Sequence, residues 1–183
     1  MHMALKARRW TRADLYEMPE DGKRYEVIDG VLYLMAPPTP RHEQIRAALA
    51  DRLRPFVKEH HLGDVREGRP AFAPNDDLVE PDLLVSTTPR PVPDRWEKMP
   101  LPVLVVEVLS PSTARHDRVV KRNFYRRSQV PEYWIVAGAA RSVTVVTPKT
   151  EQIVTDRLIW TPPGCPAPLE IDLPRLFTEA LWE

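Results

Sequence analysis

The chain has 183 residues with 26 basic and 26 acidic side chains, so its formal net charge is zero. This length is typical of one domain with a sizeable hydrophobic core, and the charge balance excludes a protein that is basic throughout. The one cysteine, Cys165, excludes an intramolecular disulfide and a zinc site of several thiolates. No apolar run approaches the ~18 residues of a membrane-spanning helix, and we expect a cytoplasmic protein without membrane contact.

Local signals predict the first elements of the chain. Thr11 and Asp14 have the spacing of a capping box and indicate the start of a short helix. We expect residues 1–10, before this helix, to be poorly ordered. Residues 24–35 are typical of two strands joined by Asp29-Gly30, the dipeptide favoured in a type I′ hairpin turn.

The rest of the chain mixes strands and helices. Residues 40–58 place apolar side chains at helical spacing, with charged ones opposite, and predict an amphipathic helix. Residues 103–109 are nearly all apolar, as in a central strand covered on both faces, and the proline-rich segment 88–102 before them predicts a long loop. Further strands are expected at 65–73, 78–86, 133–137, 142–147, 152–155 and 168–173, and further helices at 111–128 and 173–181. Together these elements predict one α+β domain over 1–183, with a mixed central sheet flanked by helices.

Two carboxylates lie inside apolar, strand-like runs, at Asp82 and Glu107. Ionised carboxylates are seldom fully buried unless they are paired or bind a metal. Because Mg²⁺ prefers oxygen ligands and often takes only one or two carboxylates, the pair predicts a shared Mg²⁺ site, in which Mn²⁺ could substitute. The backbone carbonyl of Val108 is a candidate further ligand. Such a site would activate water for hydrolysis.

Each carboxylate also has a structural interpretation. Asp82 follows a proline and could be a turn aspartate, and Glu107 could form a buried ion pair with an arginine. Glu80, two residues before Asp82, would share its face in a regular strand and could be an outer ligand or orient water.

The helix expected after Glu107 carries Asp117, Lys121 and Tyr125 on one face. Lys121 could orient the attacking water or hold the scissile phosphate as a point charge. Alternatively, Asp117 and Lys121 form a solvent-exposed ion pair one helical turn apart. Tyr125 is a candidate for substrate binding or a packing residue.

Basic side chains cluster along the same helix, between residues 115 and 127. They could form a solvated face, or they could bind the phosphates of a nucleic acid, with Arg118 and Arg122 as candidate contacts. His42 is a further candidate at the start of the amphipathic helix, where the alternative is a capping or surface role. The chain contains no P-loop, GxGxxG, HExxH or GxSxG motif, which argues against nucleotide-binding, zincin and serine-hydrolase functions.

Several segments in order resemble the Uma-two family of endonucleases, a branch of the PD-(D/E)XK nuclease superfamily. The resemblance lies in YEVIDG at 25–30, EPDLLV at 80–85, VVEVLSPST at 105–113 and VPEYWIV at 130–136, with His42, Asp117, Lys121 and Tyr125. It covers most of the chain, and the ordered set is far more specific than a proline-aspartate pair. It implies a restriction-endonuclease-like αβββαβ core and often a homodimer.

The resemblance also implies roles for single residues. Asp82 matches the motif aspartate and Glu107 the second acidic ligand. Leu109 stands where the superfamily pattern would place a lysine, and Lys121 matches the lysine that this branch supplies from the following helix. Glu26 matches an acidic residue of the first hairpin, as a metal ligand or a water-orienting group; the alternative is an exposed strand residue.

Two functional hypotheses follow. The first is a Mg²⁺-dependent endonuclease that hydrolyses DNA with Asp82, Glu107 and Lys121. The second is a catalytically inactive binding or regulatory module that keeps the nuclease fold. The presence of all three chemical residues favours the enzyme.

Overall fold

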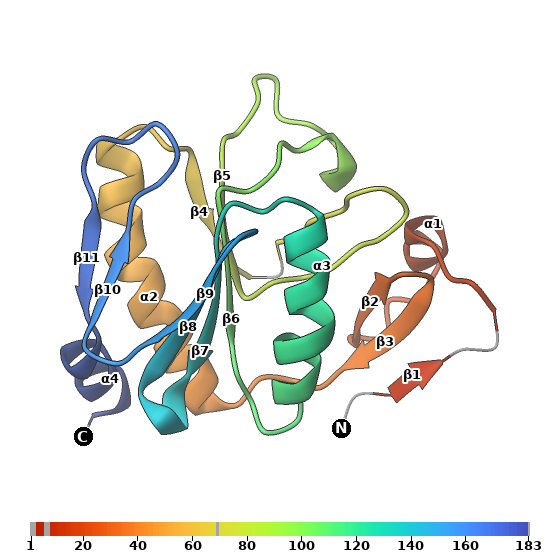
Figure 1. The fold of residues 1–183 in the computed structure, drawn as a ribbon. Helices are drawn as coiled ribbons and strands as arrows, with labels where there is room; N and C mark the ends of the chain where they lie inside the picture. Colours follow the sequence, from red (N-terminus) through yellow and green to blue (C-terminus); the bar gives the residue numbers. More distant parts are fainter. Residues whose placement is uncertain (1–2, 6–7, 69, 183) are drawn as a thin grey trace.

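The computed structural model describes residues 3–5, 8–68 and 70–182. Figure 1 shows the course of the chain through these residues. The elements, in chain order, are β1 (Met3–Leu5), α1 (Arg12–Tyr16), β2 (Arg24–Ile28), β3 (Val31–Met35), α2 (Pro40–Glu59), β4 (Asp64–Arg66), β5 (Leu83–Ser86), η1 (Trp96–Lys98), β6 (Leu104–Val108), η2 (His116–Lys121), α3 (Arg122–Arg127), β7 (Tyr133–Ala137), η3 (Gly138–Ala140), β8 (Ser142–Val146), β9 (Glu151–Val154), β10 (Arg157–Trp160), β11 (Leu169–Asp172) and α4 (Leu173–Leu181).

A mixed sheet in the order β4-β5-β6-β7-β8-β9 forms the centre of the fold. Only β6 and β7 are parallel, and the other neighbours are antiparallel. A parallel pair needs a crossover connection, which the helical segment of η2 and α3 provides between these two strands. The α+β fold with a mixed sheet and an N-terminal hairpin is therefore confirmed.

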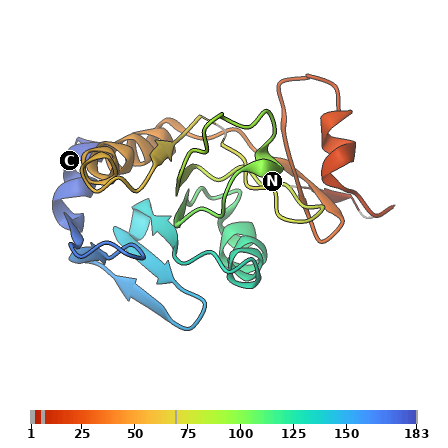
Figure 2. The same cartoon turned by 90° about the horizontal axis from the view of Figure 1, so that it is seen from above.

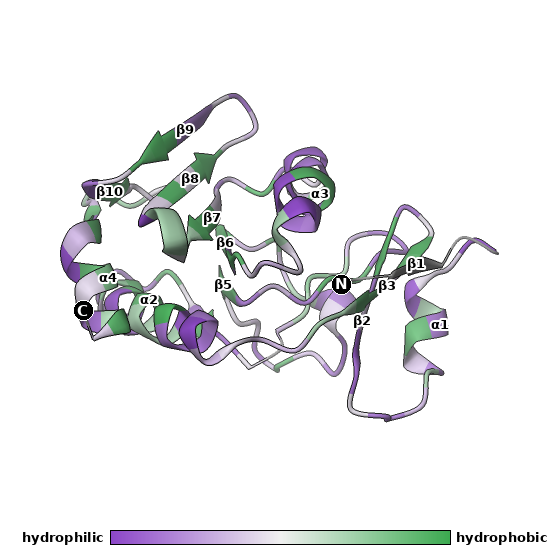
Figure 3. Cartoon of the chain, turned by 90° about the horizontal axis from the view of Figure 1, so that it is seen from below, coloured by the Kyte–Doolittle hydropathy of each residue, from purple (hydrophilic) through white to green (hydrophobic). Residues whose placement is uncertain are grey.

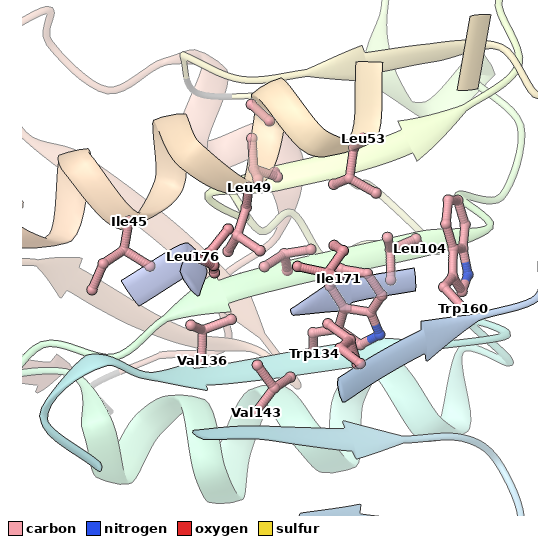
Figure 4. Close-up of a cluster of buried hydrophobic side chains, with 14 of the residues drawn as sticks. Ile45, Leu49, Leu53, Leu104, Trp134, Val136, Val143, Trp160, Ile171 and Leu176 are labelled. Atoms are coloured by element: carbon pink, nitrogen blue, oxygen red, sulfur yellow. The ribbon is translucent and has the colours of Figure 1, made fainter. Parts of the chain in front are cut away.

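Helices cover both faces of this sheet, with α2 and α4 on one side and α3 on the other (Figures 1 and 3). Apolar side chains of α2, including Ile45, Leu49 and Leu53, pack on the strands in the larger core, together with the small β10–β11 sheet (Figure 4). Phe124 and Tyr125 of α3 belong to a second cluster on the opposite face. Because β6 is buried along its whole length, the central strand predicted at 103–109 is confirmed.

The N-terminal elements form a separate three-stranded sheet, β1-β3-β2, at the end of the molecule opposite α4 (Figure 2). The hairpin turn has positive φ at both central residues, 55° at Asp29 and 76° at Gly30, as a type I′ turn requires. The capping box of Thr11 and Asp14 is formed as predicted. Residues 1–10 are predicted to be poorly ordered; in the structure, Met3–Leu5 of this segment pair with β3, and residues 1–2 and 6–7 lie outside the described residues.

The structure differs from the predicted elements in several places. The strand predicted at 78–86 is regular only over β5, and Leu78 and Val79 form isolated bridges. The strand predicted at 65–73 is limited to β4, and beyond it Phe72 forms only an isolated bridge to Val79. The strand β10 was not predicted, because the outward-facing Ile159, 53% exposed, hides its alternation. The helix expected at 111–128 starts with a turn and is π-helical over η2, which changes the side chains that share a face.

Candidate active site

Strand register brings the two predicted carboxylates face to face. Leu84 pairs with Val105 and Leu83 with Val106 in the antiparallel pair β5–β6. Asp82 directly precedes β5, and continuing this register by one residue sets it opposite Glu107; both residues line one cavity. Cβ atoms of residues opposite each other in such a pair are typically about 4.5–5.5 Å apart. Alternation along the strands directs both carboxylates to the face covered by α3, because Leu84 and Val105 belong to the cluster on that face.

Asp82 is held from two sides. Its Oδ2 accepts hydrogen bonds from Nε2 of His42, at 2.9 Å, and from the backbone N–H of Val108, at 2.8 Å. His42 lies in the first turn of α2, which Thr39 caps, so the start of this helix fixes the position of the imidazole. Burial lowers the pKa of His42, but the carboxylates of Asp82 and Glu43 outweigh it and raise the pKa above its usual value.

Glu107 is held from the helical side. Its Oε1 accepts hydrogen bonds from Nζ of Lys121, at 2.7 Å, and from the hydroxyl of Tyr125, at 3.1 Å. Lys121 also forms an ion pair of 2.8 Å with Oε1 of Glu26. Lys121 is 1% exposed and Glu26 is fully buried, so the exposed alternatives for both residues are wrong.

The π-helical turn explains why Lys121 reaches Glu26. In a π-helix, residues five apart are linked along the axis, and η2 thus brings His116 and Lys121 to the same side. Nε2 of His116 lies 3.4 Å from Oε2 of Glu26, and the backbone N–H of Glu80 donates to Oε1 at 3.0 Å. Both carboxylate oxygens of Glu26 are therefore engaged by the protein, and the site depends on a helical irregularity that the spacing of the sequence did not reveal.

The charges of the site are unevenly compensated. Burial raises the pKa of Glu107 well above its usual range. Lys121 lowers this pKa, but the nearby carboxylates of Asp82 and Asp117 raise it and offset part of that effect. Burial also raises the pKa of Asp117. By contrast, Lys121 and His116 overcome burial at Glu26 and lower its pKa to about 2. Lys121 thus interacts with several acids, and the pKa values of Glu107 and Asp117 remain raised.

A small cavity of about 20 Å³ lies between these groups. A space of this size holds about one water molecule. Asp117 has a buried oxygen, Oδ1, without a hydrogen-bond partner. The cavity is lined by Arg24, Met35, Ala36, Pro38, His42, Asp82, Glu107, Val108, Ser110, Thr113, Asp117 and Lys121.

The donor set of the cavity fits Mg²⁺ or Mn²⁺. Asp82 and Glu107 supply hard carboxylate oxygens, and Asp117, which has an unpartnered buried oxygen, also lines the cavity. Across the described residues, no three His, Cys, Asp or Glu side chains are arranged to hold a metal ion by themselves. An ion would therefore depend on two carboxylates and on water or substrate oxygens, as is common for Mg²⁺.

The structure brings most of the predicted site residues together. Asp82, Glu107, Val108, Lys121 and His42 line one cavity. Glu26 does not line it and acts through Lys121. Tyr125 is 1% exposed and lies behind Glu107, in contact with its carboxylate.

The other candidates lie away from the cavity. Arg122 forms an ion pair with Glu151 of β9, at the sheet edge three strands from β6, and Arg118 is exposed on η2. The carboxylate of Glu80 forms an ion pair of 3.2 Å with Nε of Arg24. Because β5 begins only at Leu83, Glu80 and Asp82 are not part of a regular strand that would set them on one face.

Arg24 is a site residue that sequence reasoning missed. It lines the cavity, and it shares a face of β2 with Glu26, two residues further on. The two-residue spacing of Arg24 and Glu26 was the signal in the sequence, and it points to Arg24 only once Glu26 is known to pair with Lys121.

Comparison with known structures identifies the class of fold. A crystal structure described as "a putative nuclease belonging to DUF820 from Anabaena variabilis ATCC 29413" superimposes with a TM-score of 0.78 at 18% identity, covering 93% of this chain and 98% of that chain. The protein therefore has the fold of that nuclease-like structure.

The family follows from the sequence. The pattern of the Uma2 family, described as "Putative restriction endonuclease", matches residues 12–177. The chain belongs to the Uma2 family, and the resemblance seen in its motifs is confirmed. No curated protein sequence matches the chain. None of the helices described here is long and apolar enough to span a membrane.

Proposed function

We propose that the protein is a metal-dependent endonuclease that hydrolyses DNA phosphodiester bonds at the Asp82–Glu107 cavity. The single observation that carries the proposal is the cavity itself, in which two opposed carboxylates and the ammonium of Lys121 surround space for one water or ion. Membership of a family of restriction-endonuclease-like proteins supports the choice of nucleic acid as substrate.

The residues of the chain have distinct parts in this proposal. Asp82 and Glu107 would hold Mg²⁺, with the carbonyl of Val108 as a candidate third oxygen. When bound, the ion lowers the pKa of water and stabilises charge on phosphoryl oxygens. Lys121, fixed by Glu26, is placed to hold the attacking water or the scissile phosphate. His42 positions Asp82, and Tyr125 positions Glu107.

The decisive test is conversion of supercoiled plasmid to nicked or linear DNA with Mg²⁺ or Mn²⁺. We would compare the wild type with Glu107→Gln and Asp82→Asn, which keep the shape of each side chain and remove its charge. Glu132→Gln is the matched control, because Glu132 is a largely buried glutamate whose partner, Trp134, lies outside the cavity. Cleavage that needs the metal, disappears in both site variants and persists in the control would support the proposal.

A second measurement separates metal binding from cleavage. An ion that binds only the folded state raises the melting temperature. We expect Mg²⁺ to stabilise the wild type and Glu132→Gln but not Asp82→Asn. Stabilisation without cleavage of any DNA would favour the inactive module, and equal cleavage by all variants would indicate a contaminating nuclease.

We also propose a homodimer, because a double-strand cut requires two sites. Light scattering of the purified protein tests this point, and a monomeric mass at the concentrations that cleave both strands would contradict it.

A further inference from the structure

An open groove lies beside the candidate active site and takes no part in the chemistry described above. It has a volume of about 580 Å³, within the range of small-ligand sites. Three aromatic side chains line it, Tyr16 at the end of α1, Tyr25 in β2 and Trp96 in η1, and we call it the aromatic groove. The apolar residues Ala71 and Leu78 also line it.

The aromatic rings are held in place but not covered. Tyr16 is 46% exposed, and Tyr25 and Trp96 are partly buried. The hydroxyl of Tyr16 donates to Glu97 at 2.9 Å, and that of Tyr25 donates to Asp21 at 3.0 Å. Trp96 packs against the cluster of Ala71, Ala73 and Leu78. Rings fixed in this way lose little conformational freedom when a flat ligand stacks on them.

The groove is connected to the cavity through one ion pair. Glu80 lines the groove and Arg24 lines the cavity, and Arg24 donates to the carboxylate of Glu80 at 3.2 Å and to its carbonyl oxygen at 2.7 Å. These bonds use two of the five N–H donors of the guanidinium. Among the described residues, Nη1 of Arg24 donates no hydrogen bond, which leaves it for a phosphate oxygen at the cavity.

We propose that the aromatic groove binds unpaired nucleobases of the nucleic-acid strand whose phosphate lies at the cavity. This inference rests on the proposed nuclease function and adds a substrate class, a single-stranded segment. A base stacks on an aromatic ring through its flat face, whatever its identity, whereas bases inside a duplex already stack on each other. Arg24 stands between groove and cavity, so a nucleotide would place its base on the rings and its phosphate beside Asp82 and Glu107.

The test measures binding separately from cleavage. A fluorescein-labelled thymidine oligonucleotide of about a dozen nucleotides, close to the site sizes of single-strand binding grooves, is titrated in EDTA at fixed salt and followed by anisotropy. A duplex of the same length is titrated in parallel. The variant is Tyr16→Ala, because this side chain is 46% exposed and its helix contains no buried residue, so its loss should spare the core. Trp182→Ala is the matched control, since Trp182 is 88% exposed and does not line the groove.

We expect the wild type to bind the single strand more tightly than the duplex. Tyr16→Ala should weaken single-strand binding on the order of tenfold, and Tyr16→Phe and Trp182→Ala should bind like the wild type. If Tyr16→Ala binds the single strand as tightly as the wild type while plasmid cleavage still depends on metal, the proposal that the aromatic groove binds bases is wrong and the nuclease function is unaffected. Failure of the wild type to bind the strand would overturn the groove as well. A change in oligomeric mass on Tyr16→Ala, with unchanged strand binding, would assign the groove to contacts between copies and overturn the proposal.

Discussion

Asp82 and Glu107 face each other across two antiparallel strands, yet their carboxylates are supported from opposite sides. His42, from the start of α2, holds Asp82 at 2.9 Å, and Lys121, from the end of η2, holds Glu107 at 2.7 Å. The two acids are therefore positioned by helices on the two different faces of the sheet. Changes to either helix should act on one acid and spare the other.

Replacing His42 should impair the site without unfolding the protein. In His42→Ala, the hydrogen bond from the backbone of Val108 is the one that Asp82 keeps within the described part of the chain. Loss of a group that orients a metal ligand commonly weakens metal binding by about 10- to 100-fold. We expect a shift of this size in the Mg²⁺ concentration that gives half-maximal cleavage. His60→Ala, at the far end of α2, is the control, and an unshifted metal requirement in His42→Ala would contradict the positioning role.

Removing the charge of Lys121 should destabilise the fold. Lys121→Met leaves the buried carboxylates of Glu26 and Glu107 without their shared cation. Breaking a buried pair on one side costs about 3–5 kcal/mol. We expect this loss in urea unfolding, and we expect the combined variant Lys121→Met, Glu26→Gln, Glu107→Gln to recover much of it. A loss below about 1 kcal/mol, typical of exposed pairs, would contradict a buried network.

Glu132 should lower stability as the pH rises. Burial raises its pKa above the ordinary 4.5, against a hydrogen bond from Nε1 of Trp134, so the folded state holds the proton more tightly than the unfolded state. Stability is therefore lost between the unfolded and the folded pKa and stays lower at higher pH. Glu132→Gln should gain stability relative to the wild type as the pH rises through this window. Melting temperatures of both proteins measured across this pH range check the prediction. It would be contradicted if the advantage of Glu132→Gln over the wild type became smaller as the pH rises.

Gly63 should tolerate no side chain. Its φ is 111°, and an added Cβ would lie 2.2 Å from the carbonyl oxygen of Ser86 in the neighbouring strand. Gly164 also has a positive φ, 77°, but an added Cβ would meet nothing within 4 Å. We expect Gly164→Ala to cost about 1–2 kcal/mol, the usual strain of a left-handed residue. Gly63→Ala should lose clearly more stability in the same unfolding measurement. Equal losses of stability in the two variants would show that the backbone at Ser86 moves easily to make room for the added Cβ.

Local signals allowed much of the fold to be predicted. The Asp29-Gly30 turn, the capping box at Thr11 and the apolar run of β6 each depend on residues adjacent in sequence. The helix α4 has the predicted bounds because Asp172 caps it and a proline follows in its first turn. β10 was missed because an exposed isoleucine breaks the expected alternation.

Part of the candidate site could also be predicted from residues adjacent in sequence. A charge inside an apolar run, at Asp82 or Glu107, is visible in the sequence itself. The partners of these charges depend on long-range packing. Lys121 was expected to pair with Asp117 if exposed, but the π-helical turn directs it to Glu26, and no spacing rule anticipates that turn. The place of Arg24 at the cavity also depends on long-range packing, because it follows from the position of the whole hairpin.

The ion pair of Glu26 and Lys121 joins residues 121 − 26 = 95 positions apart. Closing so long a segment costs conformational entropy, and contacts between residues far apart in sequence slow folding. During synthesis the hairpin that carries Glu26 leaves the ribosome well before the helix that carries Lys121. Lys121 and Glu26 thus meet only after the helix has emerged, and shorter nascent chains lack the assembled candidate site.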